Sequence, residues 1–269
     1  MSKIVISSPT NQTIKDLVRL KERKGDRSGM SFVVEGCREI YRAVQSGFLI
    51  EDFFYCEEEL QPESRVLIES MRLQRIAEVS KDAFSKVATR EGSDGVIGVF
   101  KQKKSSFDDV KTRASDSDLF IMVIENVEKP GNLGAVLRSA DAAGVHGVIV
   151  LGSPIDMWNP NVIRSSLGGV FSVPVVQSDV HEFFKFCGAN KIKTIAAALR
   201  SESKSIFALD LRGPLAVILG SEAHGLTEGV LNRSHSVATI PMLGLCDSLN
   251  ISVAAGIFMY EVLRQRTMR

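Results

Sequence analysis

The chain has 269 residues, 44% of them hydrophobic, and a formal net charge of +1. The length and composition predict one large or two small domains with hydrophobic cores, whereas the net charge says little about partners, because only its distribution could matter. The four cysteines include no C-x-x-C pair and the four histidines show no H-x-x-x-H spacing, so we expect neither a disulfide framework nor a metal site. The N-terminus lacks a signal-peptide core and no apolar run reaches the roughly 18 residues of a membrane span, so we expect a soluble, cytoplasmic protein.

The first 100 residues alternate between short helical and short extended patterns. The first helix is expected behind a cap at Thr10 and Asn11, because Ile14, Leu17 and Val18 form one apolar stripe. This alternation predicts a small sheet covered by helices. The other expected elements are strands at 32–36, 51–56, 75–80 and 95–101 and helices at 37–47, 64–74 and 81–89.

The beginning of the chain is basic. Its first 30 residues contain seven lysines and arginines against three acidic residues. Such a segment is typical of an arm that binds nucleic-acid phosphates. A solvated helix face has the same composition, and charge alone favours that simpler interpretation. The candidate phosphate contacts here are Arg19, Arg23, Lys24 and Arg27.

A polar segment divides the chain. Residues 101–118 (KQKKSSFDDVKTRASDSD) are rich in charge and serine and lack apolar periodicity. We therefore predict an N-terminal domain at 1–100, a linker at 101–118 and a second domain at 119–269, both domains being α/β.

The second domain repeats the alternation with longer elements. The apolar run 119–127 is typical of a strand buried on both faces of a parallel sheet. A helix follows at 132–144, with Asn132 at its cap and Gly144 at its end. The other expected elements are strands at 147–152, 173–176, 193–200, 214–220 and 236–241 and helices at 160–171, 181–190 and from 249 onward.

Two glycine-bearing loops and a polar helix start lie late in the chain. The turn LGSEAHGL contains Gly220 and Gly225, the loop IPMLG follows a later strand, and the last helix opens on Asp247, Ser248 and Asn250. Because ligands of open α/β sheets bind where such loops meet, these residues predict a pocket. Tight turns and helix capping explain the same residues without a ligand. The fingerprints of dinucleotide and triphosphate binding are absent from the sequence.

Three segments of the second domain occur together and in order. ENVEKPGNLGAVLRSADAAGVHGVIV contains an N-x-G-x-x-x-R pattern at Asn132, Gly134 and Arg138, and LGSEAHGL contains G-x-E-x-x-G. IPMLGLCDSLNISVAAGI contains I-P-M-x-G-x-x-x-S-L-N-x-S-V-A. In these three segments the sequence resembles the SpoU/TrmH family of RNA ribose 2′-O-methyltransferases, of the SPOUT superfamily, with Ile251 where that family usually has valine. The resemblance covers about residue 119 to the end, and 1–100 resembles more loosely a small RNA-binding domain of ribosomal-protein (L30e-like) type.

The resemblance implies a parallel-sheet domain with a C-terminal trefoil knot, S-adenosylmethionine as methyl donor, no metal, and a homodimer whose subunits share the active sites. The residues that it implies for the donor are Ala197, Ala198, Leu199, Gly220, Gly225, Ile240, Met242 and Leu249. The residues that it implies for catalysis are Arg138, Asn132, Ser248, Asn250 and Glu222. Because an arginine normally stays charged, we expect Arg138 to bind phosphate and stabilise alkoxide charge and not to act as a base. Arg164 is a further candidate for phosphate contact, with a surface arginine as the equally weighted alternative.

The implied function is methylation of a ribose 2′-hydroxyl in structured RNA, with ribosomal RNA favoured over transfer RNA because of the additional N-terminal domain. The alternatives are a tRNA ribose methyltransferase, a non-catalytic RNA-binding protein of the same fold, and a base methyltransferase of the same superfamily. A nicotinamide-linked dehydrogenase is remote, since its phosphate-binding turn is absent.

Overall fold

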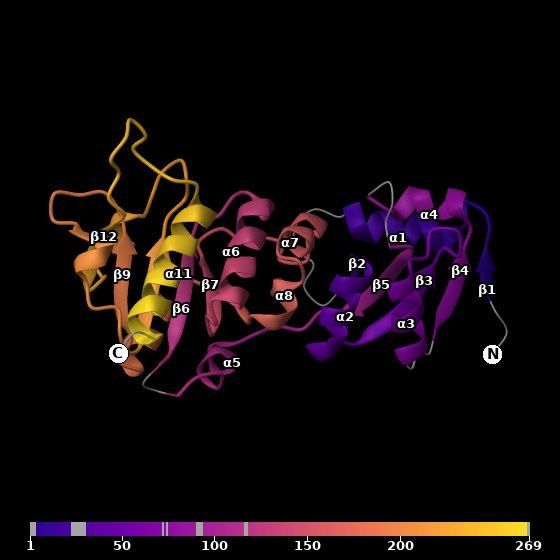
Figure 1. Cartoon of the computed structure of the whole chain (residues 1–269), viewed down its shortest axis with the longest axis horizontal. Coiled ribbons are helices and arrows are strands. Elements are labelled where there is room, and N and C mark those ends of the chain that lie inside the picture. Colours follow the sequence, from indigo (N-terminus) through magenta and orange to yellow (C-terminus); the bar gives the residue numbers. More distant parts are fainter. Residues whose placement is uncertain are drawn as a thin grey trace. The chain divides into compact units, whose positions relative to one another are not determined.

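The computed structural model describes residues 4–22, 31–71, 73, 75–89, 94–115 and 118–267. The chain forms two compact units, whose elements are labelled in Figure 1. Unit 1 consists of Met1–Lys103 and Asp156–Ser172, and unit 2 consists of Lys104–Ile155 and Val173–Arg269. Both units combine helices with a sheet, so the predicted α/β class is confirmed.

Unit 1 is built around a five-stranded sheet in the order β1-β4-β3-β5-β2. β4 pairs in parallel with β1 and β3, whereas β5 pairs antiparallel with β3 and β2. The core joins α1 and α4 to the sheet through buried side chains such as Ile14, Phe84 and Val99. The elements are β1 (Ile4–Ile6), α1 (Gln12–Glu22), β2 (Ser31–Glu35), α2 (Cys37–Gln45), β3 (Ile50–Tyr55), α3 (Pro62–Ser70), β4 (Ile76–Val79), α4 (Lys81–Val87) and β5 (Val96–Lys101).

Unit 1 also contains α7 (Pro160–Ser165) and α8 (Gly169–Ser172), which come from later in the chain. Trp158 stacks on Phe32 of β2 with ring centroids 4.4 Å apart, and Phe171 lies 6.1 Å from the same ring. All three rings are buried, and aromatic burial of this kind stabilises the docked segment. This segment therefore packs with unit 1, although it lies within the predicted domain at 119–269.

Unit 2 is built around a seven-stranded, fully parallel sheet in the order β10-β12-β9-β11-β6-β7-β8. Every residue of β6, β7 and β11 is buried, as expected for apolar strands covered on both faces. The elements are α5 (Phe107–Lys111), β6 (Phe120–Glu125), α6 (Pro130–Ala142), β7 (Gly147–Leu151), β8 (Val175–Ser178), α9 (Val180–Ala189), β9 (Lys193–Ala197), β10 (Lys204–Ser205), the 3₁₀ turn Ile206–Ala208, β11 (Leu215–Leu219), α10 (Glu228–Leu231), β12 (Ser236–Thr239) and α11 (Ile251–Thr267).

Part of the predicted linker belongs to unit 2. The segment 101–118 contains α5, which a capping box between Ser106 and Asp109 starts. Val110 is fully buried in the core of unit 2, and Phe107 stacks on Phe186 at 4.5 Å. One apolar turn surrounded by charge is too short for periodicity to reveal, so the sequence predicted no helix here.

The order of the strands in unit 2 positions the site. β9 pairs in parallel with both β11 and β12, so the carboxyl ends of these three strands lie at one edge of the sheet. The loop after β12 leads from this edge into α11, which lies beside α6 in Figure 1 and also packs against β11. Loops that are far apart in the sequence therefore meet at the edge where open α/β sheets bind ligands.

Candidate functional site

A pocket of about 490 Å³ lies at this edge of unit 2. Its lining is mostly apolar, and the exposed polar side chains that precede α11, Asp247, Ser248 and Asn250, form its mouth. The lining residues are Ala197, Ala198, Leu199, Leu219, Gly220, Ser221, Glu222, Gly225, Ala238, Thr239, Ile240, Met242, Asp247, Ser248, Leu249, Asn250, Ile251, Ala254 and Phe258. All eight residues expected for the donor are among them, and so are Glu222, Ser248 and Asn250 from the expected catalytic set.

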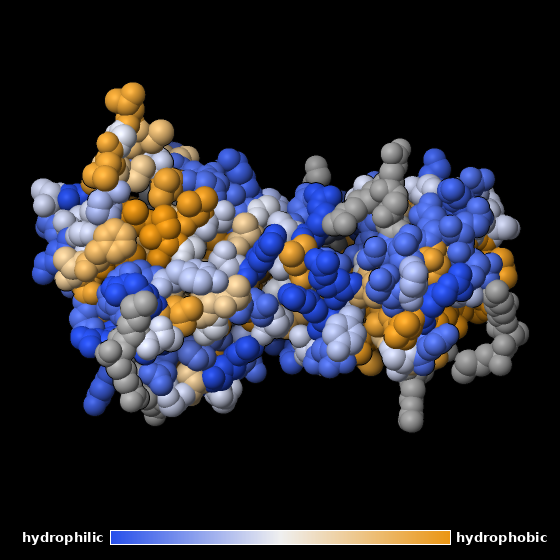
Figure 2. Space-filling model, in the orientation of Figure 1, coloured by the Kyte–Doolittle hydropathy of each residue, from blue (hydrophilic) through white to orange (hydrophobic). Residues whose placement is uncertain are grey.

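The loop before α11 exposes hydrophobic side chains. Leu243 and Leu245 are almost fully exposed, and Val253 on α11 is half exposed. Figure 2 shows hydrophobic residues gathered on this part of the surface. Unpartnered apolar side chains beside a pocket are typical of a surface that another molecule covers.

Three catalytic candidates form one hydrogen-bond network at the mouth of the pocket. Asn250 Nδ2 donates to Glu222 Oε1 over 2.5 Å and lies 3.3 Å from Asn132 Oδ1. Lys129, immediately before α6, donates from Nζ to Glu222 Oε2 at 3.0 Å. The network joins the start of α6, the glycine loop after β11 and the start of α11, which are far apart in the sequence.

Lys129 and Glu222 stabilise each other's charged forms. The hydrogen bond and charge of Lys129 hold the pKa of the Glu222 carboxyl below its usual range, and further hydrogen bonds from Asn132 and the Ile251 backbone act in the same direction. The carboxylate in turn raises the pKa of Lys129. Because both groups are exposed, this pair is ionised at neutral pH and screened by solvent.

Asn250 has a second role as a helix cap. Its Oδ1 accepts hydrogen bonds from the backbone N–H of Ser252 at 2.9 Å and from the Ser252 hydroxyl at 2.6 Å. The capping interpretation and the network interpretation therefore hold together, since the oxygen caps the helix while the nitrogen reaches Glu222. The neighbouring Ser248 hydroxyl donates to Asp247 Oδ1 at 3.4 Å.

The glycine loop requires glycine at Gly220. A Cβ there would lie 2.0 Å from the carbonyl carbon of Gly225, which is far inside van der Waals contact. Gly225 itself has φ +67° and donates its N–H to the Ser221 carbonyl at 2.9 Å. The end of the loop is fixed by buried Glu125, which accepts from the Thr227 N–H at 2.8 Å and from the Thr227 hydroxyl at 2.7 Å.

Arg138 does not join this network within one chain. It is exposed on α6 and is not one of the residues that line the pocket. Asn132 and Arg138 are six positions apart on a helix of 3.6 residues per turn, so they project from different faces. The prediction that Asn132 and Arg138 belong to one polar network is therefore wrong within a single chain.

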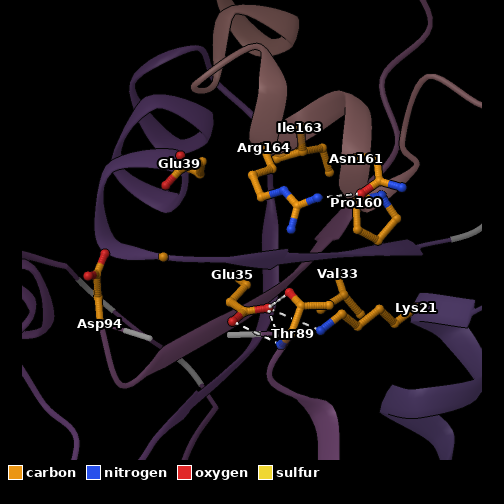
Figure 3. A pocket seen from close by; sticks show the side chains of 11 residues that line it. Lys21, Val33, Glu35, Glu39, Thr89, Asp94, Pro160, Asn161, Ile163 and Arg164 are labelled. Carbon is orange, nitrogen blue, oxygen red and sulfur yellow. Dashed lines mark hydrogen bonds and ion pairs between the residues drawn. The ribbon is translucent and has the colours of Figure 1, made fainter. Parts of the chain in front are cut away.

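Arg164 lies in unit 1. Together with Lys21, Glu35, Glu39 and Asp94 it lines another pocket, and its guanidinium, which points into that pocket in Figure 3, donates to Asn161 Oδ1 at 2.8 Å. Three carboxylates line the same pocket, so this neighbourhood adds nothing to the expected phosphate contact.

Among the basic candidates near the N-terminus, Arg19 is exposed, and its Nη1 lies 3.6 Å from Asp16 Oδ1. Arg23, Lys24 and Arg27 lie outside the described residues. Within those residues there is no group of three or more metal-ligating side chains, and no helix is long and apolar enough to cross a membrane.

The sequence predicted Asp247 as part of the polar helix start but gave it no separate role, and it assigned no role to Lys129 or Glu125. Lys129 stands inside the first quoted motif, so its position alone could have indicated it. In the sequence Glu125 is only the last residue of an apolar strand. Its hydrogen bond from Thr227 forms because the fold brings these two residues together, so the sequence could not indicate it.

Two family models and several known proteins match this chain. The SpoU rRNA Methylase family model matches residues 119–260, and the MRM3-like substrate binding domain model matches residues 11–98. The 23S rRNA (uridine(2479)-2′-O)-methyltransferase of Streptomyces viridochromogenes is 30% identical over 90% of this chain and 85% of its own length. The tRNA (guanosine(18)-2′-O)-methyltransferase of Thermus thermophilus is 37% identical over 57% of this chain and 78% of its own.

Solved structures are similar over nearly the whole chain. A crystal structure of an RNA 2′-O ribose methyltransferase has a TM-score of 0.86 and 37% identity, covering 98% of this chain and 100% of its own. The AdoMet-bound rRNA methyltransferase of Sinorhizobium meliloti has a TM-score of 0.86 and 27% identity, covering 98% of each chain.

Proposed function

Because this chain belongs to the SpoU rRNA Methylase family, we propose that it transfers a methyl group from S-adenosylmethionine to a ribose 2′-hydroxyl of ribosomal RNA. One observation carries the proposal: the eight residues expected for the donor and the Asn250–Glu222–Asn132 network meet at one pocket. Ribosomal RNA is favoured over transfer RNA because the Streptomyces relative matches 90% of this chain, whereas the tRNA relative matches only 57%.

The pocket fits the donor in size and chemistry. Its volume of about 490 Å³ lies within the range of roughly 300–1,000 Å³ typical of small-molecule sites. Ala197, Ala198 and Ile240 provide small or apolar surface and backbone groups, which suit a neutral adenine. The Gly220 turn brings backbone close to the cavity where a side chain would not fit. Glu222 and Asp247 suit the positive methionine end of the donor.

The chemistry needs alignment more than activation of the donor. When bound, S-adenosylmethionine supplies the methyl group: the ribose 2′ oxygen bonds to the methyl carbon, the carbon–sulfur bond breaks with its electrons left on sulfur, and the hydroxyl proton passes to solvent. Asn250 and Ser248 orient the ribose at the pocket mouth, and Glu222 and Asn132 hold Asn250 in place.

A homodimer completes this proposal. Arg138 is exposed on α6, away from the pocket of its own chain, and Val253 and Tyr260 are about half exposed on the adjoining α11. A second copy packed on this face would cover the apolar side chains and supply Arg138 to a site that lacks it. There the guanidinium binds the acceptor's phosphate and stabilises charge developing on the 2′ oxygen.

Finer features of the fold belong to the same proposal. A trefoil knot at the C-terminus is supported by the path of the chain, since α11 follows β12 yet returns across β9 to pack on α6 and β11. An L30e-like type for the N-terminal domain is supported by the match to a substrate-binding domain. The proposed site of action is the cytoplasm. The free thiols of Cys37, Cys56, Cys187 and Cys246 fit this reducing compartment.

Two measurements test the function. We expect calorimetry to detect S-adenosylmethionine binding, and we expect 2′-O-methyl mapping of total RNA to show one position in ribosomal RNA that is lost without the gene and restored with it. Donor binding without methyl transfer would favour the non-catalytic alternative. A methylated base in the nucleoside analysis would contradict the proposed reaction, and a lost position in transfer RNA would contradict the proposed substrate.

A further inference from the structure

The charged residues that line the donor pocket are both acidic. Of the 19 lining residues, only Glu222 and Asp247 carry a charge at neutral pH, and none is a lysine, arginine or histidine. A negative lining is unexpected in a protein proposed to bind RNA, because phosphates are repelled by carboxylates. The pocket charge therefore suits a different ligand from the RNA itself.

The two carboxylates differ in their surroundings. Glu222 is paired with Lys129 at 3.0 Å and accepts from Asn250, so much of its charge is balanced inside the protein. Asp247 forms no ion pair with any residue that the structure describes, and its hydrogen bond from Ser248 is long at 3.4 Å. Asp247 is exposed at the pocket mouth, so its charge is available to a bound molecule.

The donor and the product of the proposed reaction differ by one charge. S-adenosylmethionine carries a sulfonium, an ammonium and a carboxylate, and is a net cation. S-adenosylhomocysteine keeps the ammonium and the carboxylate but has a neutral thioether, so its net charge is zero. The two molecules are otherwise nearly the same size, and an unbalanced negative charge in the pocket distinguishes them.

We propose that Asp247 is a specificity-determining residue that favours the cationic methyl donor over the neutral product. This inference rests on the proposed function. Asp247 lines the pocket next to Ser248 and Leu249, so its carboxylate borders the cavity that the donor occupies in the proposed function. A pair of unit charges near a protein surface interacts strongly enough to change a dissociation constant about fivefold, and solvent screening keeps the effect from being much larger.

The test compares ligands of different charge on the full-length protein. Calorimetry measures the dissociation constants of S-adenosylmethionine, S-adenosylhomocysteine and sinefungin, an analogue in which an amine replaces the sulfonium and restores the positive charge. In Asp247→Asn we expect about fivefold weaker binding of S-adenosylmethionine and sinefungin, and a change of less than about twofold for S-adenosylhomocysteine. The loss for the two cations should shrink at high salt.

Asp210→Asn is the matched control. It removes the same charge from an exposed aspartate that precedes β11, at the opposite end of that strand from the pocket, and it should leave all three constants unchanged. Asp247→Glu keeps the charge and should preserve the preference for the cations. Equal weakening of all three ligands in Asp247→Asn, or an unchanged ratio, would overturn the inference while leaving the function intact. Failure of the unmodified protein to bind any of them would overturn the proposed function and this inference together.

Discussion

Asn250 Nδ2 lies 2.5 Å from Glu222 Oε1, so the first turn of the last helix is joined directly to the glycine loop after β11. The same Asn250 caps α11 through Oδ1, which accepts from Ser252. One side chain thus stabilises a helix with its oxygen and organises the pocket mouth with its nitrogen. The two contributions can be separated by substitutions that change one end of the amide.

Asn250→Asp should keep the cap and lose the network. The carboxylate still accepts from Ser252, but it cannot donate to Glu222 and repels it. We expect thermal stability close to that of the unmodified protein and a turnover number lower by roughly a hundredfold, because a misplaced acceptor ribose loses its alignment. Asn250→Ala should lose turnover to a similar extent and also about 1 kcal/mol of stability, since the cap is gone. Full activity of Asn250→Asp would show that the network is not needed.

Gly220→Ala should destabilise unit 2 and weaken donor binding. The new methyl group would lie 2.0 Å from the Gly225 carbonyl carbon, and backbone cannot move aside as a flexible side chain does. Overpacking of this kind costs about 1–3 kcal/mol. Gly229→Ala is the control, because its Cβ would meet only Thr227 Oγ1 at 3.8 Å. Denaturant unfolding and calorimetry with S-adenosylmethionine measure both effects, and equal behaviour of the two variants would contradict the assignment.

The sequence was sufficient for most of the pocket. Ala197, Gly220 and Ile240 each stand at or just beyond the end of a strand, and parallel strands bring such ends to one edge, so their meeting followed from pattern and motif together. The arrangement of the charged side chains beside the pocket could not be predicted from the sequence. The Lys129–Glu222 pair depends on where two loops meet in space, and neither residue has a local partner that would reveal it.

The remaining differences have a common physical cause. Trp158 and Phe171 pack on Phe32 of unit 1, although they belong to a segment between two strands of unit 2. Their burial is decided by tertiary contacts, and a contiguous domain boundary cannot represent it. Val110 is a similar case, because one buried residue inside a charged segment leaves no periodic pattern.

His146 should make the stability of unit 2 sensitive to acid. Its Nδ1 accepts the Phe120 N–H at 3.0 Å, and burial, with a smaller contribution from the charge of Arg266, lowers the pKa of the imidazole. A lowered pKa means that the unfolded chain binds the proton more readily, so this stability is present above the ordinary histidine pKa and is lost as pH falls below it.

Melting temperatures between pH 7.5 and pH 5 test this for His146→Asn, which keeps an acceptor but cannot be protonated in this range. We expect the variant to lose less stability on acidification than the unmodified protein. His181→Asn is the control, because His181 is exposed on α9. A pH profile of His146→Asn that parallels the unmodified protein would contradict the prediction.

Arg138→Ala should nearly abolish methyl transfer while leaving the affinity for S-adenosylmethionine unchanged, because Arg138 does not line the pocket of its own chain. Whether Arg138 acts in the partner's site can be tested by mixing inactive subunits. If each site combines Arg138 of one subunit with Asn250 of the other, a heterodimer of Arg138→Ala and Asn250→Asp contains one site with both substitutions and one site with neither. Random pairing then restores about a quarter of the sites. If Arg138 and Asn250 act within one chain, no site in any pairing is intact and the mixture stays inactive. Refolding the two purified variants together, and measuring methyl transfer against each variant refolded alone, therefore distinguishes a shared site from two independent ones.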